Sequence, residues 1–235
     1  MNSPSKLDFH PDFSIQKFLI GEEKAALLVI DNLVEQSEAL VSQAASLTFS
    51  STGQGFPGIR ALAPVSYQRF LLERLTPTLV DNFQLPSSQL GFSMCHYSLV
   101  TTPPGKLSMV QRIPHVDSFD KNGLATVHYL FKKNLGGTAF YRHLKTGYEY
   151  VDEMRKVDYF KSLQEENDGS NLPSPAYING DTALFKQIAR QDGVFNRMLI
   201  YRRNSLHSGC IDESFIPDDN PLTGRLSLNS FIDLR

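Results

Sequence analysis

The segment from Ile113 to His143 limits the possible folds and functions of this chain more than any other segment. It places two side chains of metal-binding type close together. His115 and Asp117 stand two positions apart in I-P-H-V-D. In an extended segment successive side chains alternate faces, so this imidazole and this carboxylate point the same way. A second imidazole from elsewhere in the chain would complete the 2-His-1-carboxylate set that binds non-haem Fe(II) and leaves coordination positions open.

His207 is the candidate for the second imidazole. It follows the apolar run M-L-I-Y in N-R-M-L-I-Y-R-R-N-S-L-H-S-G, and the turn-forming residues around it predict the end of a strand. Further on, Arg225 lies in G-R-L-S-L-N-S-F-I, again a strand pattern. Asp212 is the strongest rival carboxylate, but no histidine stands two positions from it.

The order of these motifs resembles the Fe(II)/2-oxoglutarate-dependent oxygenases, and within them the prolyl-4-hydroxylase-like branch. In that branch a tyrosine-leucine pair, a glycine pair and a phenylalanine follow H-x-D, and an N-R-hydrophobic strand leads to the second histidine. The resemblance covers about residues 89 to 235. The matching residues here are Tyr129-Leu130, Gly136-Gly137, Phe140, Asn196-Arg197 and Arg225.

This resemblance implies a set of cofactors and ligands. His115, Asp117 and His207 would bind Fe(II), 2-oxoglutarate would take two of the open positions, and O2 would take the third. The far carboxylate of 2-oxoglutarate needs a cation. Arg225 suits it, because a guanidinium offers two parallel donors and stays charged near neutral pH.

Three further side chains are predicted to contact the cosubstrate. Tyr129 is in phase with Ala125 and Val127, so on an inward face its hydroxyl would reach the same carboxylate, as the matching tyrosine does in relatives. Asn229 lies four residues after Arg225 and shares its face. Tyr97 precedes the H-x-D segment, where the family places a tyrosine lining the pocket.

The implied reaction is hydroxylation of an unactivated C–H bond, with succinate and CO2 as coproducts. Asp117 fills the position that halogenating relatives free, which favours hydroxylation. The substrate is open between a small molecule and a peptide or protein side chain. Two other function classes also stay open: a catalytically inactive jelly-roll module that binds a ligand, and a hydrolytic metalloenzyme that would not need Arg225.

The fold predicted is mainly β with supporting helices, a double-stranded β-helix or jelly-roll barrel. We expect one domain over residues 1–235, with an N-terminal part (1–88) and a core (89–235). The N-terminal part comprises an arm over residues 1–21, a strand over 25–30, and helices over 35–47 and 66–82. The core has strands at 90–100 and 107–113, a hairpin of 124–131 with 138–141, a partly helical insertion over 151–190, and strands at 198–201 and 225–232.

The loop over residues 51–64 is rich in glycine and proline and holds Phe56 and Arg60. It is open between a border of the substrate entrance and a plain surface connection. The other histidines are expected to be structural or exposed: His10, His96, His128 and His143. Arg112 and Arg142 are open between solvated rim residues and contacts to an acidic substrate group.

Composition narrows the class of protein. A hydrophobic fraction of 41% supports a packed core, and a net charge of -2 without charge runs argues against a nucleic-acid partner. There is no apolar run of membrane-spanning length and no secretory signal pattern. Cys95 and Cys210 are the two cysteines. We interpret them as buried hydrophobes in a cytoplasmic protein.

Overall fold

The computed structural model describes residues 6–51, 53, 55–166 and 171–235. Ten strands in this part of the chain form two antiparallel sheets, which confirms the mainly-β prediction. The larger sheet has the order β1-β2-β8-β5-β10-β4-β3 and the smaller one the order β7-β6-β9. The strands are β1 (Ser14–Ile20), β2 (Ala25–Asp31), β3 (Gly58–Leu62), β4 (Leu90–Val100), β5 (Leu124–Tyr129), β6 (Gly137–His143), β7 (Phe185–Asp192), β8 (Met198–Arg202), β9 (His207–Cys210) and β10 (Leu226–Leu234).

The inner faces of the two sheets pack against each other. Tyr201 of β8 and Phe140 of β6 meet edge to face, with their ring centroids 5.0 Å apart. Leu27 and Leu199 of the large sheet belong to the same buried cluster as Phe140. This cluster closes one part of the space between the sheets, and the remaining part forms the cavity described below.

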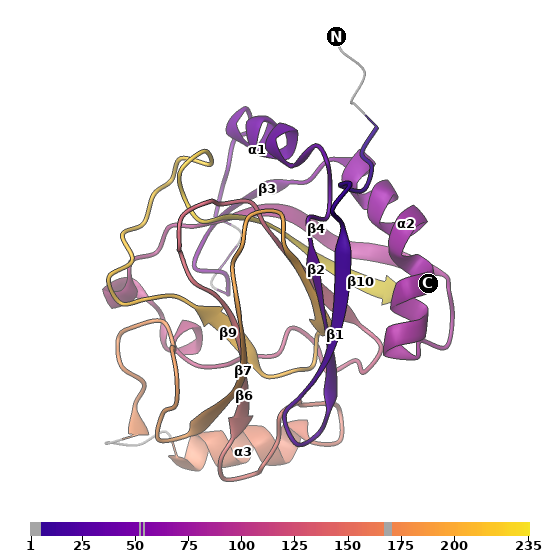
Figure 1. The fold of residues 1–235 in the computed structure, drawn as a ribbon. Helices are drawn as coiled ribbons and strands as arrows, with labels where there is room; N and C mark the ends of the chain where they lie inside the picture. The colour runs from indigo at the N-terminus through magenta and orange to yellow at the C-terminus, as the bar shows by residue number, and fades with distance from the viewer. Residues whose placement is uncertain (1–5, 52, 54, 167–170) are drawn as a thin grey trace.

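The outer face of the large sheet is covered by helices α1 (Ser37–Ala45) and α2 (Val65–Phe83). The apolar residues of α2 recur at helical spacing, so one stripe of the helix is buried against the sheet. Pro77 lies inside this helix without ending it. Figure 1 shows α2 beside β4 and β10, on the side away from the small sheet. The buried residues of α2 are Tyr67, Phe70, Leu71, Leu75, Leu79 and Phe83.

Strand β10 lies between β4 and β5 and presents a different chemistry on each face. Leu226 and Leu228 pack into the helix-side core. The alternate residues, among them Ser227 and Asn229, line the cavity between the sheets. The period of two in R-L-S-L-N-S-F therefore separates core from cavity.

The predicted hairpin of residues 124–131 with 138–141 is wrong. β5 pairs with β8 and β10 in the large sheet, whereas β6 pairs with β7 and β9 in the small one. The intervening residues therefore cross from one sheet to the other. At the crossing Gly136 has a φ of 82°, and a Cβ at this position would overlap the Cys210 carbonyl oxygen. The glycine pair thus serves a close approach between backbones rather than a tight turn.

Two further segments differ from their predictions. Residues 107–113 were expected to be a strand, but Met109–Gln111 is a 3-10 helix, η2, after a first one, η1 (Pro104–Lys106). Ser108 and Gln111 close η2 with a capping box, a local arrangement that competes with strand pairing. In addition, the C-terminal end of the predicted insertion belongs to strand β7, whose backbone pairs with β6.

The N-terminal arm is also more ordered than expected, since β1 pairs with β2 along its whole length. Helix α3 (Lys156–Glu166) supplies the predicted helical part of the insertion. Residues 1–5 of the arm, 52 and 54 of the 51–64 loop and 167–170 of the insertion lie outside the described part of the chain. The division into 1–88 and 89–235 stays a prediction. Among the described helices, none combines the length and apolarity that crossing a bilayer requires.

Candidate metal centre

Backbone pairing brings the distant histidines together. The His115 N–H donates to the His207 carbonyl at 2.9 Å, and the His207 N–H donates to the His115 carbonyl at 3.0 Å. His207 begins strand β9, rather than ending a strand as predicted, and this antiparallel bridge adds the H-x-D segment to the edge of the small sheet. The Asp117 N–H donates a hydrogen bond to the Arg203 carbonyl at 2.8 Å.

The three predicted metal-binding side chains converge. Asp117 Oδ2 lies 3.4 Å from His207 Nε2, and Asp117 Oδ1 lies 3.8 Å from His115 Nε2. One ligand atom from each residue lies within 4.8 Å of the others. This spacing suits two imidazole nitrogens and one carboxylate oxygen around a divalent ion, and the donor types are those of a facial triad.

The surroundings prepare both imidazoles to bind a metal. His207 Nδ1 lies 2.9 Å from the Ser205 carbonyl, so it carries the proton and leaves the Nε2 lone pair free. The rings of His207 and Tyr201 have centroids 4.7 Å apart, which fixes the imidazole plane. Although 50% of the His115 side chain stays accessible, desolvation and the neighbouring His207 lower the pKa of His115. Near pH 7 this keeps His115 neutral, which is the form that binds a metal.

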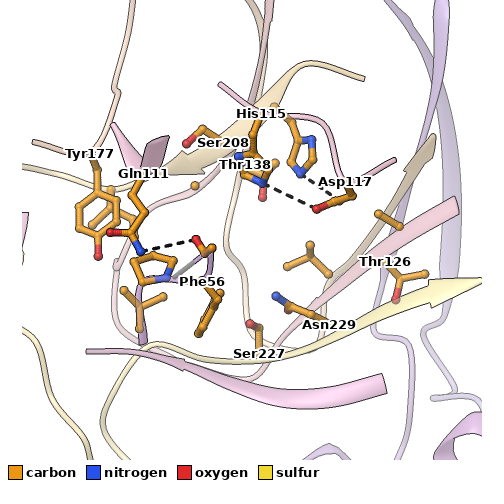
Figure 2. A pocket seen from close by; sticks show the side chains of 18 of the residues that line it. Phe56, Gln111, His115, Asp117, Thr126, Thr138, Tyr177, Ser208, Ser227 and Asn229 are labelled. Carbon is orange, nitrogen blue, oxygen red and sulfur yellow. Dashed lines mark hydrogen bonds and ion pairs between the residues drawn. The ribbon is translucent and has the colours of Figure 1, made fainter. Parts of the chain in front are cut away.

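The centre opens into a cavity of about 460 Å³ between the sheets. His115 and Asp117 lie at one wall, while Ser227 and Asn229 project from the strand at the opposite wall (Figure 2). Ala125 and Val127 of β5 also line the cavity, as their predicted phase requires. This volume is within the usual range for small-molecule sites.

Arg225 lines the same cavity, and the protein backbone holds its guanidinium in place. Its Nε donates to the Leu135 carbonyl and its Nη2 to the Gly137 carbonyl, both at 2.8 Å. Arg225 has no carboxylate partner within the described residues. Burial lowers the pKa of Arg225 from its ordinary value, but a guanidinium remains charged near neutral pH. The site therefore holds a buried, pre-oriented cation that an anionic ligand would neutralise.

Tyr129 is buried beside this cation. Arg225 lies over its ring, 5.9 Å from the centroid, and the Tyr129 hydroxyl lies 2.7 Å from Thr138 Oγ1. Thr138 rather than Tyr129 lines the cavity. The tyrosine is thus adjacent to the predicted cosubstrate end, with its hydroxyl shared with the threonine.

Sequence reasoning missed Ser227 and Thr138, which line the cavity next to Arg225. Ser227 could have been found from the same alternation that identified Asn229, because it lies halfway between Arg225 and Asn229. No sequence signal marks Thr138, since its position depends on how the small sheet faces the large one.

The structure places Tyr97 outside the cavity. Its ring lies in the helix-side core, and its hydroxyl donates to Gln43 Oε1 at 3.0 Å. The prediction that Tyr97 lines the pocket is therefore wrong. On β4 the side chain of Tyr97 points to the opposite face from the cavity-lining Met94 and Val100, and this strand phase is set by the packing of α1 and α2.

Several other candidates have structural partners instead. His128 forms hydrogen bonds with Tyr67 at 3.0 Å and with Asn196 at 3.1 Å, and His143 lies 3.0 Å from Glu166.

The charged candidates also have partners. Arg112 donates to the Leu107 carbonyl, Arg142 pairs with Glu149, and the Asp212 carboxylate accepts a hydrogen bond from Ser214. His10 lies beside Asp12, and His96 borders Arg60. Cys95 and Cys210 are buried and free.

The segment 51–64 borders the cavity, and residues 58–62 of it form strand β3 rather than the loop that was predicted. Gly55, Phe56, Pro57 and Arg60 contribute to the cavity lining, which favours the substrate-entrance interpretation over a plain surface connection. The Arg60 guanidinium lies over the Phe56 ring, 4.3 Å from its centroid.

Comparisons with known proteins agree with this architecture. The sequence matches the profile of a family described as a family of unknown function (DUF6445) over residues 11–232. No curated protein sequence matches the chain.

Solved structures resemble the fold at low sequence identity. HygX from Streptomyces hygroscopicus with nickel and 2-oxoglutarate bound is 12% identical, with a TM-score of 0.52 over 89% of this chain and 83% of HygX. SnoN, a non-heme alpha ketoglutarate dependent epimerase from nogalamycin biosynthesis, is 11% identical, with a TM-score of 0.51 over 88% of this chain and 77% of SnoN. These similarities confirm the predicted double-stranded β-helix. The narrower resemblance to the prolyl-4-hydroxylase-like branch stays a prediction.

Proposed function

The chain belongs to this family, DUF6445, and we propose that it is an Fe(II)- and 2-oxoglutarate-dependent oxygenase. The single observation that carries the proposal is the meeting of His115, Asp117 and His207 in a cavity that also holds a buried arginine, Arg225. Hydroxylation of an unactivated C–H bond is the outcome we propose, since Asp117 supplies the carboxylate ligand that halogenating relatives lack.

The residues present fit the metal. Two neutral imidazoles and one carboxylate are the required donors, and His207 directs its unprotonated nitrogen toward Asp117. Among the described residues, the metal-binding cluster consists of these three side chains, so coordination positions remain for a cosubstrate and O2.

The residues also fit 2-oxoglutarate, which carries a carboxylate at each end. Arg225 would pair with the carboxylate remote from the metal, because its guanidinium is buried, charged and already oriented by two carbonyls. Ser227 and the Thr138–Tyr129 pair would donate hydrogen bonds nearby, and Asn229 stays a candidate further along β10. Burial raises the pKa of Tyr129, so its hydroxyl keeps a proton to donate.

When bound, Fe(II) and 2-oxoglutarate would supply the oxidising power, with succinate and CO2 as coproducts. The chain's own residues would hold the metal, orient the cosubstrate and shield the place of reaction. Asp117 and the two histidines fix the metal, and Arg225 fixes the cosubstrate's direction. The aromatic side chains of Tyr201 and Phe231 line the cavity and exclude water from the place where the C–H bond would lie.

The known structures support a small-molecule substrate over a protein side chain. HygX has been solved with hygromycin B bound, and SnoN in complex with nogalamycin RO. The volume of about 460 Å³ here suits a small molecule next to the cosubstrate.

Cosubstrate binding and turnover test the proposal directly. The wild-type protein should bind 2-oxoglutarate only when Fe(II) or Mn(II) is present, and with Fe(II) and air it should release succinate. His207→Ala and Asp117→Ala should abolish both. The proposal fails if the wild type shows neither metal-dependent binding nor succinate release. A hydrolytic metalloenzyme would instead keep its activity in Arg225→Ala, and an inactive module would keep ligand binding in Asp117→Ala.

A further inference from the structure

Arg60 lines the cavity, and its cationic side chain forms no ion pair with a carboxylate among the described residues. It lies on the edge strand β3, and its Nε is buried without a hydrogen-bond partner in the described part of the chain. Among the described residues, its guanidinium lies over the Phe56 ring, and its Nη1 lies 3.6 Å from the sulfur of Met94. Leaving a buried donor unsatisfied costs about 1–3 kcal/mol, and more for a charged group.

Other half-buried arginines of this protein do have oxygen acceptors. Arg112 and Arg202 donate to backbone carbonyls, and two others pair with carboxylates. Arg197 pairs with Asp31 at 2.6 Å, and Arg203 pairs with Asp233 at 2.6 Å. Arg60 and the cosubstrate candidate Arg225 are the two described arginines that line the cavity, and neither forms an ion pair among the described residues. The charge of Arg60, like that of Arg225, therefore points to an anionic ligand as its partner.

The sheet register shows which way Arg60 points. Arg60 pairs with Ser98 of β4, and Ser98 pairs in turn with Ser227 of β10. Residues directly opposite each other in adjacent strands project from the same face, so Arg60 shares the cavity face with Ser227. Burial lowers the pKa of Arg60, and the negative charge of Asp117 acts against this shift.

A second unsatisfied polar group lies on this wall. Asn229 lines the cavity, and its Oδ1 is buried without a hydrogen-bond partner in the described part of the chain. On β4 the residue opposite Asn229 is His96, whose Nδ1 is likewise buried and unpaired among the described residues. Buried polar atoms normally find partners. Two of these three atoms, Arg60 Nε and Asn229 Oδ1, belong to residues that line the cavity, where a polar ligand could satisfy them.

Charge shows what that ligand must carry. With the metal and cosubstrate of the proposed function in place, the two positive charges of Fe(II) and that of Arg225 balance the charges of Asp117 and of the two cosubstrate carboxylates. Arg60 remains as one uncompensated positive charge. Burying an unpaired charge is costly, so a substrate with one negative charge would complete the site.

We propose that Arg60 recognises a carboxylate on the substrate, which makes this protein an oxygenase of small organic acids. The inference rests on the proposed function. A carboxylate accepts two parallel hydrogen bonds from the guanidinium edge that includes the unpaired Nε. A phosphate dianion would need a second cation, and Arg225, the other described arginine of the lining, serves the cosubstrate. Asn229 would hydrogen-bond a polar group of the same molecule.

The test uses carboxylates and their uncharged carboxamides as matched probes. The protein is loaded with Mn(II) and saturating 2-oxoglutarate and titrated calorimetrically with hexanoate and hexanamide, 3-phenylpropanoate and 3-phenylpropanamide, and N-acetyl-leucine and N-acetylleucinamide. The wild type should bind at least one acid ten or more times tighter than its amide. Arg60→Gln should lose this preference, Arg60→Lys should keep part of it, and Arg69→Gln, on the exposed face of α2, should keep all of it.

The outcomes separate the two proposals. Arg60→Gln should bind Mn(II) and 2-oxoglutarate as the wild type does, which also shows that the variant is folded. If the wild type does not bind them, the proposed function fails. If it binds them but prefers no acid over its amide, or if Arg60→Gln keeps the preference, the inference about Arg60 is overturned. A preference that disappears as 2-oxoglutarate is raised would place the acids at Arg225 and would also overturn it.

Discussion

Replacing Arg225 by methionine should remove cosubstrate binding while changing the stability of the unliganded protein little. Two effects oppose each other in the unliganded state. Arg225 makes two hydrogen bonds to backbone carbonyls, each contributing about 1.5–3 kcal/mol for a charged donor. Against this, the buried charge has no carboxylate partner among the described residues, and desolvating such a charge costs several kcal/mol. Methionine fills a similar volume without the charge.

We therefore expect the free energy of unfolding of metal-loaded Arg225→Met to lie within about 2 kcal/mol of the wild type without 2-oxoglutarate, since the two effects nearly cancel. With 2-oxoglutarate at one hundred times its Kd, the wild type should gain about 2.7 kcal/mol. The variant should gain nothing. The difference between the two proteins thus appears only when the cosubstrate is present.

Urea unfolding with Mn(II), with and without 2-oxoglutarate, measures both quantities. Arg69→Met, on the exposed face of α2, is the matched control and should keep the full cosubstrate effect. If Arg225→Met retains most of the stabilisation by 2-oxoglutarate, the remote carboxylate is bound elsewhere and the assignment of Arg225 is wrong.

Three further predictions concern the frame that holds the site. Burial lowers the pKa of His128 to about 4 from 6.5, so as pH falls through this range the unfolded chain takes up the proton first. Stability should therefore decrease from pH 7 to pH 4, by up to about 3 kcal/mol from this residue, and His128→Gln should flatten the pH dependence of the urea midpoint; an unchanged slope would contradict this. In Gly137→Ala, a Cβ would overlap the Gln191 carbonyl oxygen of β7, so we expect a loss of about 1–3 kcal/mol in the free energy of unfolding together with weaker 2-oxoglutarate binding; wild-type values for both would refute the close approach. Asn196 has a φ of 63° and hydrogen-bonds both the N–H and the carbonyl of Val34. Asn196→Ala should lower the free energy of unfolding by about 3–6 kcal/mol, as measured by thermal or urea unfolding. A decrease below about 1 kcal/mol would show that the backbone compensates.

Local periodicity carried most of what could be predicted about the site. Because side chains alternate along a strand, spacing alone put His115 beside Asp117 and put Asn229 in phase with Arg225. The same argument correctly grouped Ala125 and Val127 on an inward face. The prediction for Tyr97 was wrong. It rested on the family resemblance, and alternation states which residues share a face but not which face lies inward.

The mainly-β class could be predicted from local spacing, and the residue types of the site could be predicted from that spacing together with the family resemblance. Strand pairing could not be predicted in this way and is seen in the tertiary structure alone. The crossing between β5 and β6, the pairing of β7 with β6, and the backbone bridge between His115 and His207 all join residues whose partners are chosen by long-range packing. The tertiary structure also places Arg60 in the cavity without a carboxylate partner among the described residues, because charge pairing depends on every chain segment that surrounds a side chain and not on its neighbours in sequence.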